Sequence, residues 1–146
     1  PIQPVPVNPG GPMQPATTAS LSSHKAGAKP VALTVKVHYE MVCGQPGPGK
    51  AVLTLPAQAD VPAKIDRSAV LVNGTPSPSV TVSGHAVSIA MPLKRPGVTC
   101  MVVGPGTLTL TLTRAAGIGN PTAAGTYTIR VRRNTLAFTA RVAISA

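Results

Sequence analysis

The sequence predicts an all-β protein, an immunoglobulin-like antiparallel β-sandwich with an extended proline-rich arm at its amino-terminal end. Apolar and polar residues alternate in many short stretches, prolines and glycines separate them, and no stretch of helical length has an apolar period of 3.6 residues. Such alternation buries one face of a strand and leaves the other in water, which is typical of antiparallel sheets. A closed barrel is the alternative architecture.

The composition supports this class and points to an anionic environment. The chain has 146 residues, enough for one folded domain, and its 17 prolines and 14 glycines imply many turns. Aromatic residues make up only 2%, so valine, leucine and isoleucine must build the core. The formal net charge of +10 attracts anionic partners over long range, and no apolar run is long enough to span a membrane.

The first 29 residues differ from the rest of the chain. Residues 1–15 are rich in proline and residues 16–29 are small and polar, so we assign residues 1–29 to an arm and residues 30–146 to the β-sandwich domain. Apolar side chains come from Ile2, Val5 and Val7, while Pro4 and Pro6 remove backbone donors from one side only, which an edge strand tolerates. We therefore expect the arm to add a strand to a sheet edge of another copy, giving self-association as a homopolymer. A flexible or polyproline-II linker is the alternative.

The strands of the domain are read from period-two alternation. The clearest has Leu108, Leu110 and Leu112 on one face and threonines on the other. Hairpin turns are predicted at Asn73-Gly74, which also matches a glycosylation sequon, at Gly84-His85 and at Arg133-Asn134. The predicted strands cover residues 31–43, 50–55, 69–73, 79–83, 86–91, 98–103, 107–113, 126–132 and 135–145.

The chain has two cysteines, Cys43 and Cys100, each in an apolar, β-rich run. We predict one disulfide between them, which would imply an oxidising, extracellular compartment. Two free thiols packed as small hydrophobic groups are the alternative.

Candidate catalytic and metal-binding groups are few. The three histidines lie in separate elements without metal-ligand spacing, and only His38 and Glu40 share one face of a strand, where a surface pair is the simplest account. There is no nucleophile elbow, and the glycines near residue 117 lack the spacing of a nucleotide loop. The sequence therefore predicts no catalytic residue, no metal and no cofactor.

Basic residues gather toward the carboxyl-terminal end. Arg130 and Arg132 should point outward from one strand and Arg141 from the next, with Arg133 in the turn between them. This basic face could bind anionic cell-wall polymers or acidic patches of a neighbouring subunit; simple solubility is the alternative. The scarcity of aromatic side chains argues against nucleic acid and against sugar stacking.

One part of the chain resembles a known family. The stretch from Val70 onward is similar to a repeat of large bacterial cell-surface and S-layer-type proteins, on the residues Val72-Asn73-Gly74, Gly117-Ile118-Gly119-Asn120-Pro121 and Ala124-Gly125-Thr126-Tyr127. The resemblance covers about half the chain and implies an immunoglobulin-like fold, a surface role as spacer, adhesive or lattice module, and no active site. Tyr127 should face inward, where its hydroxyl could cap a loop carbonyl or could simply be buried.

Together these observations predict a non-catalytic, secreted structural subunit of a cell-surface fibre, pilus-like filament, layer or stalk. It would assemble through donor-strand addition of its arm. The alternative is a monomeric adhesive module that binds anionic cell-wall glycans through the basic face.

Overall fold

The computed structural model describes residues 16–42, 49–92 and 103–146. Short strands fill most of these ranges, with two single turns of 3-10 helix, η1 (Arg67–Ala69) and η2 (Arg114–Ala116). The strands are β1 (Thr18–Leu21), β2 (Leu33–Val42), β3 (Lys50–Thr54), β4 (Val70–Val72), β5 (Thr75–Pro76), β6 (Val80–Ser83), β7 (Ala86–Ala90), β8 (Val103–Leu112), β9 (Gly125–Arg133) and β10 (Leu136–Ile144).

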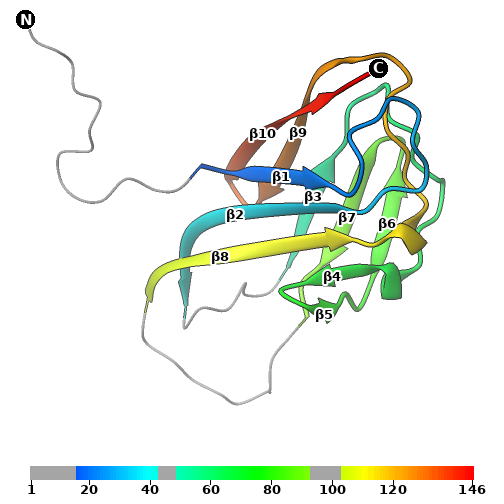
Figure 1. Cartoon of the computed structure of the whole chain (residues 1–146). Coiled ribbons are helices and arrows are strands. Elements are labelled where there is room, and N and C mark those ends of the chain that lie inside the picture. Colours follow the sequence, from blue (N-terminus) through cyan, green and yellow to red (C-terminus); the bar gives the residue numbers. More distant parts are fainter. Residues whose placement is uncertain (1–15, 43–48, 93–102) are drawn as a thin grey trace, which may run out of the picture.

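The strands form two five-stranded sheets that pack face to face (Figure 1). One sheet has the order β1-β2-β8-β4-β5 and the other the order β10-β9-β3-β7-β6. Each strand pair within them is antiparallel. This confirms the predicted all-β, immunoglobulin-like sandwich.

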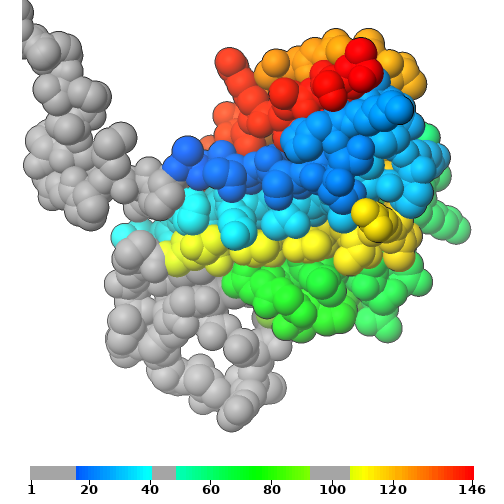
Figure 2. Space-filling view, in the orientation of Figure 1, coloured from blue at the N-terminus to red at the C-terminus, as the bar shows by residue number. Residues whose placement is uncertain are grey.

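The core between the sheets is aliphatic, as the low aromatic content requires. Leu108, Leu110 and Leu112 of β8 are fully buried, whereas the threonines between them lie on the outer face. The inward residues of β2, β3 and β7 meet them with side chains of similar size: Leu33, Val35, Val37, Ala51, Leu53, Val87 and Ile89. Figure 2 shows the outer side of the first sheet as successive bands of β1, β2, β8 and β4.

The folded domain begins before residue 30. β1 lies within the range assigned to the arm, and it pairs with β2 from Thr18↔Lys36 to Leu21↔Leu33. Ala19 and Leu21 pack against the core. These are the two apolar residues of the strand, and backbone pairing with β2 also stabilises it. The proposed assembly residues Ile2, Val5 and Val7 lie outside the described residues, as do Cys43 and Cys100.

One strand runs through a segment that the sequence analysis took as a break. β8 continues through Gly104-Pro105-Gly106, with Pro105 opposite Glu40 of β2. On the other edge of β8, β4 pairs only with residues 110–112, so no strand of the described chain lies beside Pro105 there. Proline is tolerated at such a locally exposed edge because no second neighbour requires its missing N–H.

The expected position of Arg133 was wrong by one residue. The β9–β10 turn is Asn134-Thr135, and Arg133 pairs with Leu136 as the last residue of β9. Because it shares the parity of Ile129 and Val131, its side chain faces inward and is only 2% exposed. It donates a hydrogen bond of 3.4 Å to the Lys50 carbonyl. Arg133 therefore belongs to the interior and not to the basic face.

Candidate functional site

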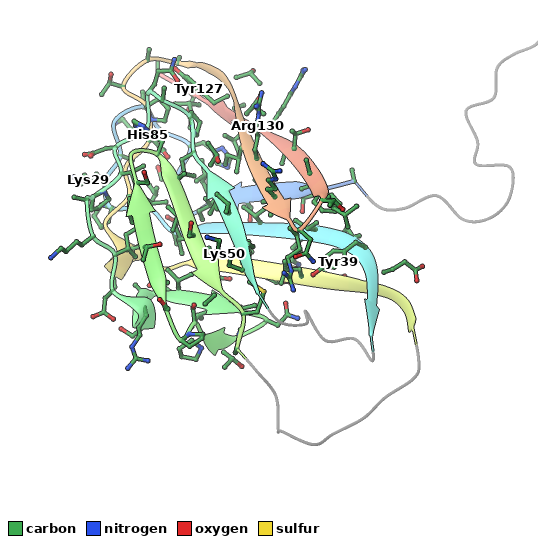
Figure 3. The ribbon with its side chains drawn as sticks, turned by 180° about the vertical axis from the view of Figure 1, so that it is seen from behind. Lys29, Tyr39, Lys50, His85, Tyr127 and Arg130 are labelled. Carbon is green, nitrogen blue, oxygen red and sulfur yellow. The ribbon has the colours of Figure 1, made fainter. Side chains whose placement is uncertain are left out.

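The outer face of the β10-β9-β3-β7-β6 sheet collects the basic residues that the sequence singled out. Arg130 and Arg132 are exposed on β9, on either side of buried Val131, and Arg141 is exposed on β10. Lys50, the first residue of β3, is a fourth exposed cation on this face. Figure 3 views the molecule from this side, with Lys50 and Arg130 on neighbouring strands. We call these four residues the cationic face.

Lys50 was missed in the sequence analysis although a signal for it exists. In β3, Ala51 and Leu53 are buried, while Lys50, Val52 and Thr54 have the opposite parity. The pairing of Val52 with Arg132 then brings that parity onto the same surface as the arginines. The sequence contains the alternation of β3, but not the pairing of β3 with β9.

Short side chains surround the long basic ones. Arg130 stands between Thr139 of β10 and Thr54 of β3, and Arg132 stands between Ala137 and Val52. A shallow groove of about 530 Å³ follows this part of the sheet, and its lining includes Thr54, Arg130, Arg132, Thr135, Ala137 and Thr139. The guanidinium groups are therefore accessible from solvent.

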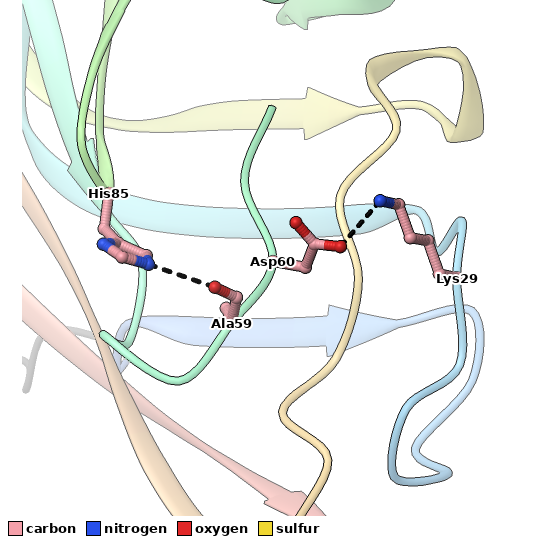
Figure 4. Close-up of polar contacts among 4 residues, drawn as sticks. All are labelled: Lys29, Ala59, Asp60 and His85. Atoms are coloured by element: carbon pink, nitrogen blue, oxygen red, sulfur yellow. Dashed lines mark hydrogen bonds and ion pairs between the residues drawn. The ribbon is translucent and has the colours of Figure 1, made fainter. Parts of the chain in front are cut away.

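The cationic face has no acidic neighbour on its own sheet surface in the described chain. Glu40 lies on β2, in the other sheet. Asp60 forms an ion pair of 2.6 Å with Lys29 in the loops (Figure 4). Asp66 caps η1, and hydrogen bonds from the Ser68 side chain and backbone hold the pKa of Asp66 below its ordinary value. The positive charge of this sheet face is consequently not neutralised locally.

A second conspicuous cluster lies where the loop before β9 meets the segment after β1. The buried side-chain amide of Asn120 donates to the carbonyls of Ser23 at 2.8 Å and Lys25 at 2.9 Å. Gly119 exchanges two backbone hydrogen bonds with Asp60. These residues of the Gly-Ile-Gly-Asn-Pro motif join three chain segments, so their role in the described contacts is structural.

Tyr127 caps this loop. Its hydroxyl donates a hydrogen bond of 2.7 Å to the Ala123 carbonyl, which confirms the expectation that it caps a backbone group. Such a tyrosine near the start of a strand is a feature of immunoglobulin-like sandwiches.

The histidines occupy three unrelated places. His24 Nδ1 lies 2.8 Å from the Ala143 carbonyl, and His38 Nδ1 lies 3.0 Å from Thr107 Oγ1 rather than against Glu40. His85 Nε2 lies 3.1 Å from the Ala59 carbonyl (Figure 4). Within residues 16–42, 49–92 and 103–146, no group of three or more His, Cys, Asp or Glu side chains could hold a metal. The same ranges contain no helix long and apolar enough to cross a bilayer.

Comparison with known proteins agrees with the fold. The class defined by the two packed sheets is the immunoglobulin-like β-sandwich. A solved structure described as BslA, a bacterial hydrophobin, superposes with a TM-score of 0.54 at 18% identity, covering 89% of this chain and 97% of that one. A second structure, described as manganese lipoxygenase of Gaeumannomyces graminis with partial zonadhesin of Komagataella pastoris, has a TM-score of 0.45 at 14% identity, covering 90% of this chain and 46% of that one. No protein-family model and no curated protein matches the chain.

Proposed function

We propose that this protein is a non-catalytic extracellular structural subunit that assembles by strand addition at the edge of β2. The observation that carries the proposal is the uneven pairing of that edge. β1 covers β2 only from Leu33 to Lys36, and no strand of the described chain lies beside Val37 to Val42 on that side. Unpaired N–H and C=O groups on such an edge can accept an added strand.

The arm is tethered next to this edge. β1 is antiparallel to β2, so a chain that continued from Thr18 toward the amino terminus in the same register would run along Val37 to Val42. Residues 1–15 end two residues before β1 begins and contain Ile2, Val5 and Val7 at positions suited to an edge strand. The same edge can accept the arm of a second copy in place of the chain's own arm, and we propose that this exchange links neighbouring copies. The BslA likeness contributes the fold alone, and a surface role like that of a hydrophobin is part of the proposal.

The experiment compares the size of assemblies formed by the full chain and by a variant that lacks residues 1–15. Light scattering should show assembly of the full chain only. A peptide of residues 1–15 should bind the truncated protein saturably. The same peptide, added to the full chain, should compete for the open edge and reduce assembly. Equal assembly of both proteins would reject strand addition by the arm.

A disulfide between Cys43 and Cys100 is part of the proposal. The β2–β8 ladder is described as far as the pair Val42↔Val103. Cys43 follows Val42 directly, and Cys100 precedes Val103 by three residues, which span at most about 11 Å when extended. Both thiols are therefore tethered to the same end of one strand pair, a location that supports a bridge.

A second candidate function rests on the cationic face. Four exposed cations without an acidic neighbour on that sheet surface favour binding of anionic cell-wall polymers. Cosedimentation with anionic and neutral polymers of equal size tests this function. Selective, salt-sensitive binding by the arm-deleted monomer would favour it, and equal binding to both polymers would reject it.

A further inference from the structure

The register of three strands places the four cations of the cationic face on one line. Arg141 lies opposite Thr128, two residues before Arg130 on β9. On β3, Val52 pairs with Arg132. Lys50 precedes Val52 by two residues, and because β3 is antiparallel to β9 it lies two residues further along the direction from Arg130 to Arg132. The order across β10, β9 and β3 is therefore Arg141, Arg130, Arg132 and Lys50, along a diagonal of the sheet.

The spacing along this diagonal is nearly regular. Neighbouring strands lie about 4.8 Å apart and each residue advances about 3.4 Å, so successive Cα atoms on the line are about 7–8 Å apart. The whole line is about 20 Å long on the same geometry. The short side chains beside it, among them Thr54, Ala137 and Thr139, leave a groove along its middle.

We propose that this diagonal binds one linear polyanion, a polyol phosphodiester of the poly(glycerol phosphate) type, with about one phosphate for each cation. This inference rests on the second candidate function and names its ligand class. In such a polymer six bonds separate neighbouring phosphorus atoms. An extended chain covers about 3.3–3.6 Å per three bonds, so its charges repeat about every 7 Å. That repeat matches the spacing of the cations.

The chemistry of the face suits phosphate. Arginine guanidinium groups bind phosphate oxygens with two parallel hydrogen bonds, and three of the four cations are arginines. Thr54 and Thr139 flank Arg130 and add hydroxyl donors. A single-stranded nucleic acid has a similar phosphate repeat, but its bases stack on aromatic rings. Tyr39 and Tyr127 pack against the core from inward-facing positions. Phe138 also packs against the core, and it is the one aromatic residue that lines the groove. A single partly buried ring cannot stack successive bases, so the outer face favours a polymer without bases.

The first experiment measures the salt dependence of binding. The probe is poly(glycerol phosphate) of defined length, titrated into the full chain at several salt concentrations. Four contacts predict a slope of log K against log salt of about −3, since each phosphate contact of a flexible single-stranded polyanion contributes about −0.7. Arg130→Thr with Arg132→Thr should halve the slope and lower affinity about tenfold. Lys36→Thr, on the other sheet, is the control and should leave the slope unchanged.

The second experiment separates position from charge. The double variant Arg130→Thr, Thr81→Arg moves one cation from the diagonal to exposed Thr81 on β6, at the far edge of the same sheet, and keeps the net charge. We expect it to bind as weakly as Arg130→Thr alone. If this variant bound with wild-type affinity, the proposal that the diagonal arrangement of the cations determines binding would be rejected. Polyanion binding by the cationic face would still stand. Equal affinity of the wild type and all variants would also reject the second candidate function.

Two further comparisons complete the test. A poly-dT oligonucleotide of equal charge should bind more weakly than poly(glycerol phosphate), and tighter binding would overturn the assigned ligand class. Affinity should rise with polymer length until about four phosphates span the line and then level off apart from a statistical factor. Circular dichroism and thermal unfolding of each variant confirm that the fold is retained.

Discussion

Asn120 and Ser23, 97 positions apart in the sequence, are joined by a hydrogen bond of 2.8 Å from the side-chain amide to the backbone carbonyl. The same amide also donates to the Lys25 carbonyl at 2.9 Å. One buried side chain thus fixes the segment that follows β1 against the loop that precedes β9. The attachment of β1 to the sandwich depends on this contact as well as on its pairing with β2.

Replacement of Asn120 by alanine should destabilise the protein by about 1–3 kcal/mol, because two carbonyls lose their donor in a partly buried site. The free energy of unfolding is measured by urea denaturation, and amide hydrogen exchange should rise in residues 22–31 before the rest of the chain. Gln58→Ala removes an exposed amide from a turn and serves as the control. Equal stability of the two variants would contradict the assigned role.

The two tyrosines provide a matched pair of hydroxyl deletions. Tyr127→Phe should cost about 1 kcal/mol, because the hydroxyl donates to the Ala123 carbonyl. Tyr39→Phe should be neutral or stabilising, because the Tyr39 hydroxyl is buried without a hydrogen-bond partner in the described part of the chain. Its ring should keep its contact with Phe138, with centroids 5.9 Å apart. Urea denaturation of both variants decides, and the reverse order of stability would refute the prediction.

The hydrogen bonds at η1 should make the stability depend on pH at the acid end. Ser68 donates to the Asp66 carboxylate and lowers its pKa. A pKa that is lower in the folded than in the unfolded state stabilises the fold above the unfolded value, and this contribution disappears as pH falls through the folded value. Ser68→Ala should raise the pKa of Asp66 toward its ordinary value. An NMR titration of the Asp66 carboxyl carbon measures it, and an identical titration in both proteins would refute the assigned cause.

The proposed disulfide predicts that the oxidised and reduced proteins differ in alkylation, mass and stability. The oxidised protein should resist alkylation and weigh two hydrogens less than the reduced form, which should accept two alkyl groups. Cys43→Ser should lower the free energy of unfolding by about 2–4 kcal/mol, because the unfolded chain loses its cross-link. The same substitution in reduced protein is the control and should change stability much less. Alkylation of both thiols without reductant would show that no bridge exists.

The alternation of apolar and polar residues by itself determined the fold class, because strand burial has a period of two that is local to each segment. Within the predicted strand 107–113, alternation alone therefore assigns Leu108, Leu110 and Leu112 to the core. The same parity assigns Arg130, Arg132 and Arg141 to an outer surface. For Tyr127 the sequence left two alternatives open, a capping hydroxyl and an ordinary buried ring, and the structure shows the capping hydrogen bond.

The tertiary structure decided what depends on pairing between distant segments. β1 is a strand because β2 offers it an edge, and Pro105 stays within β8 because β4 stops short of it. The sequence placed Arg133 in the β9–β10 turn, whereas the ladder extends one residue further and includes it. Arg133 is therefore a strand residue with a buried side chain. Lys50 joins the arginines only through the β3–β9 register, since a strand's own sequence sets its two faces but not the strand that lies beside it.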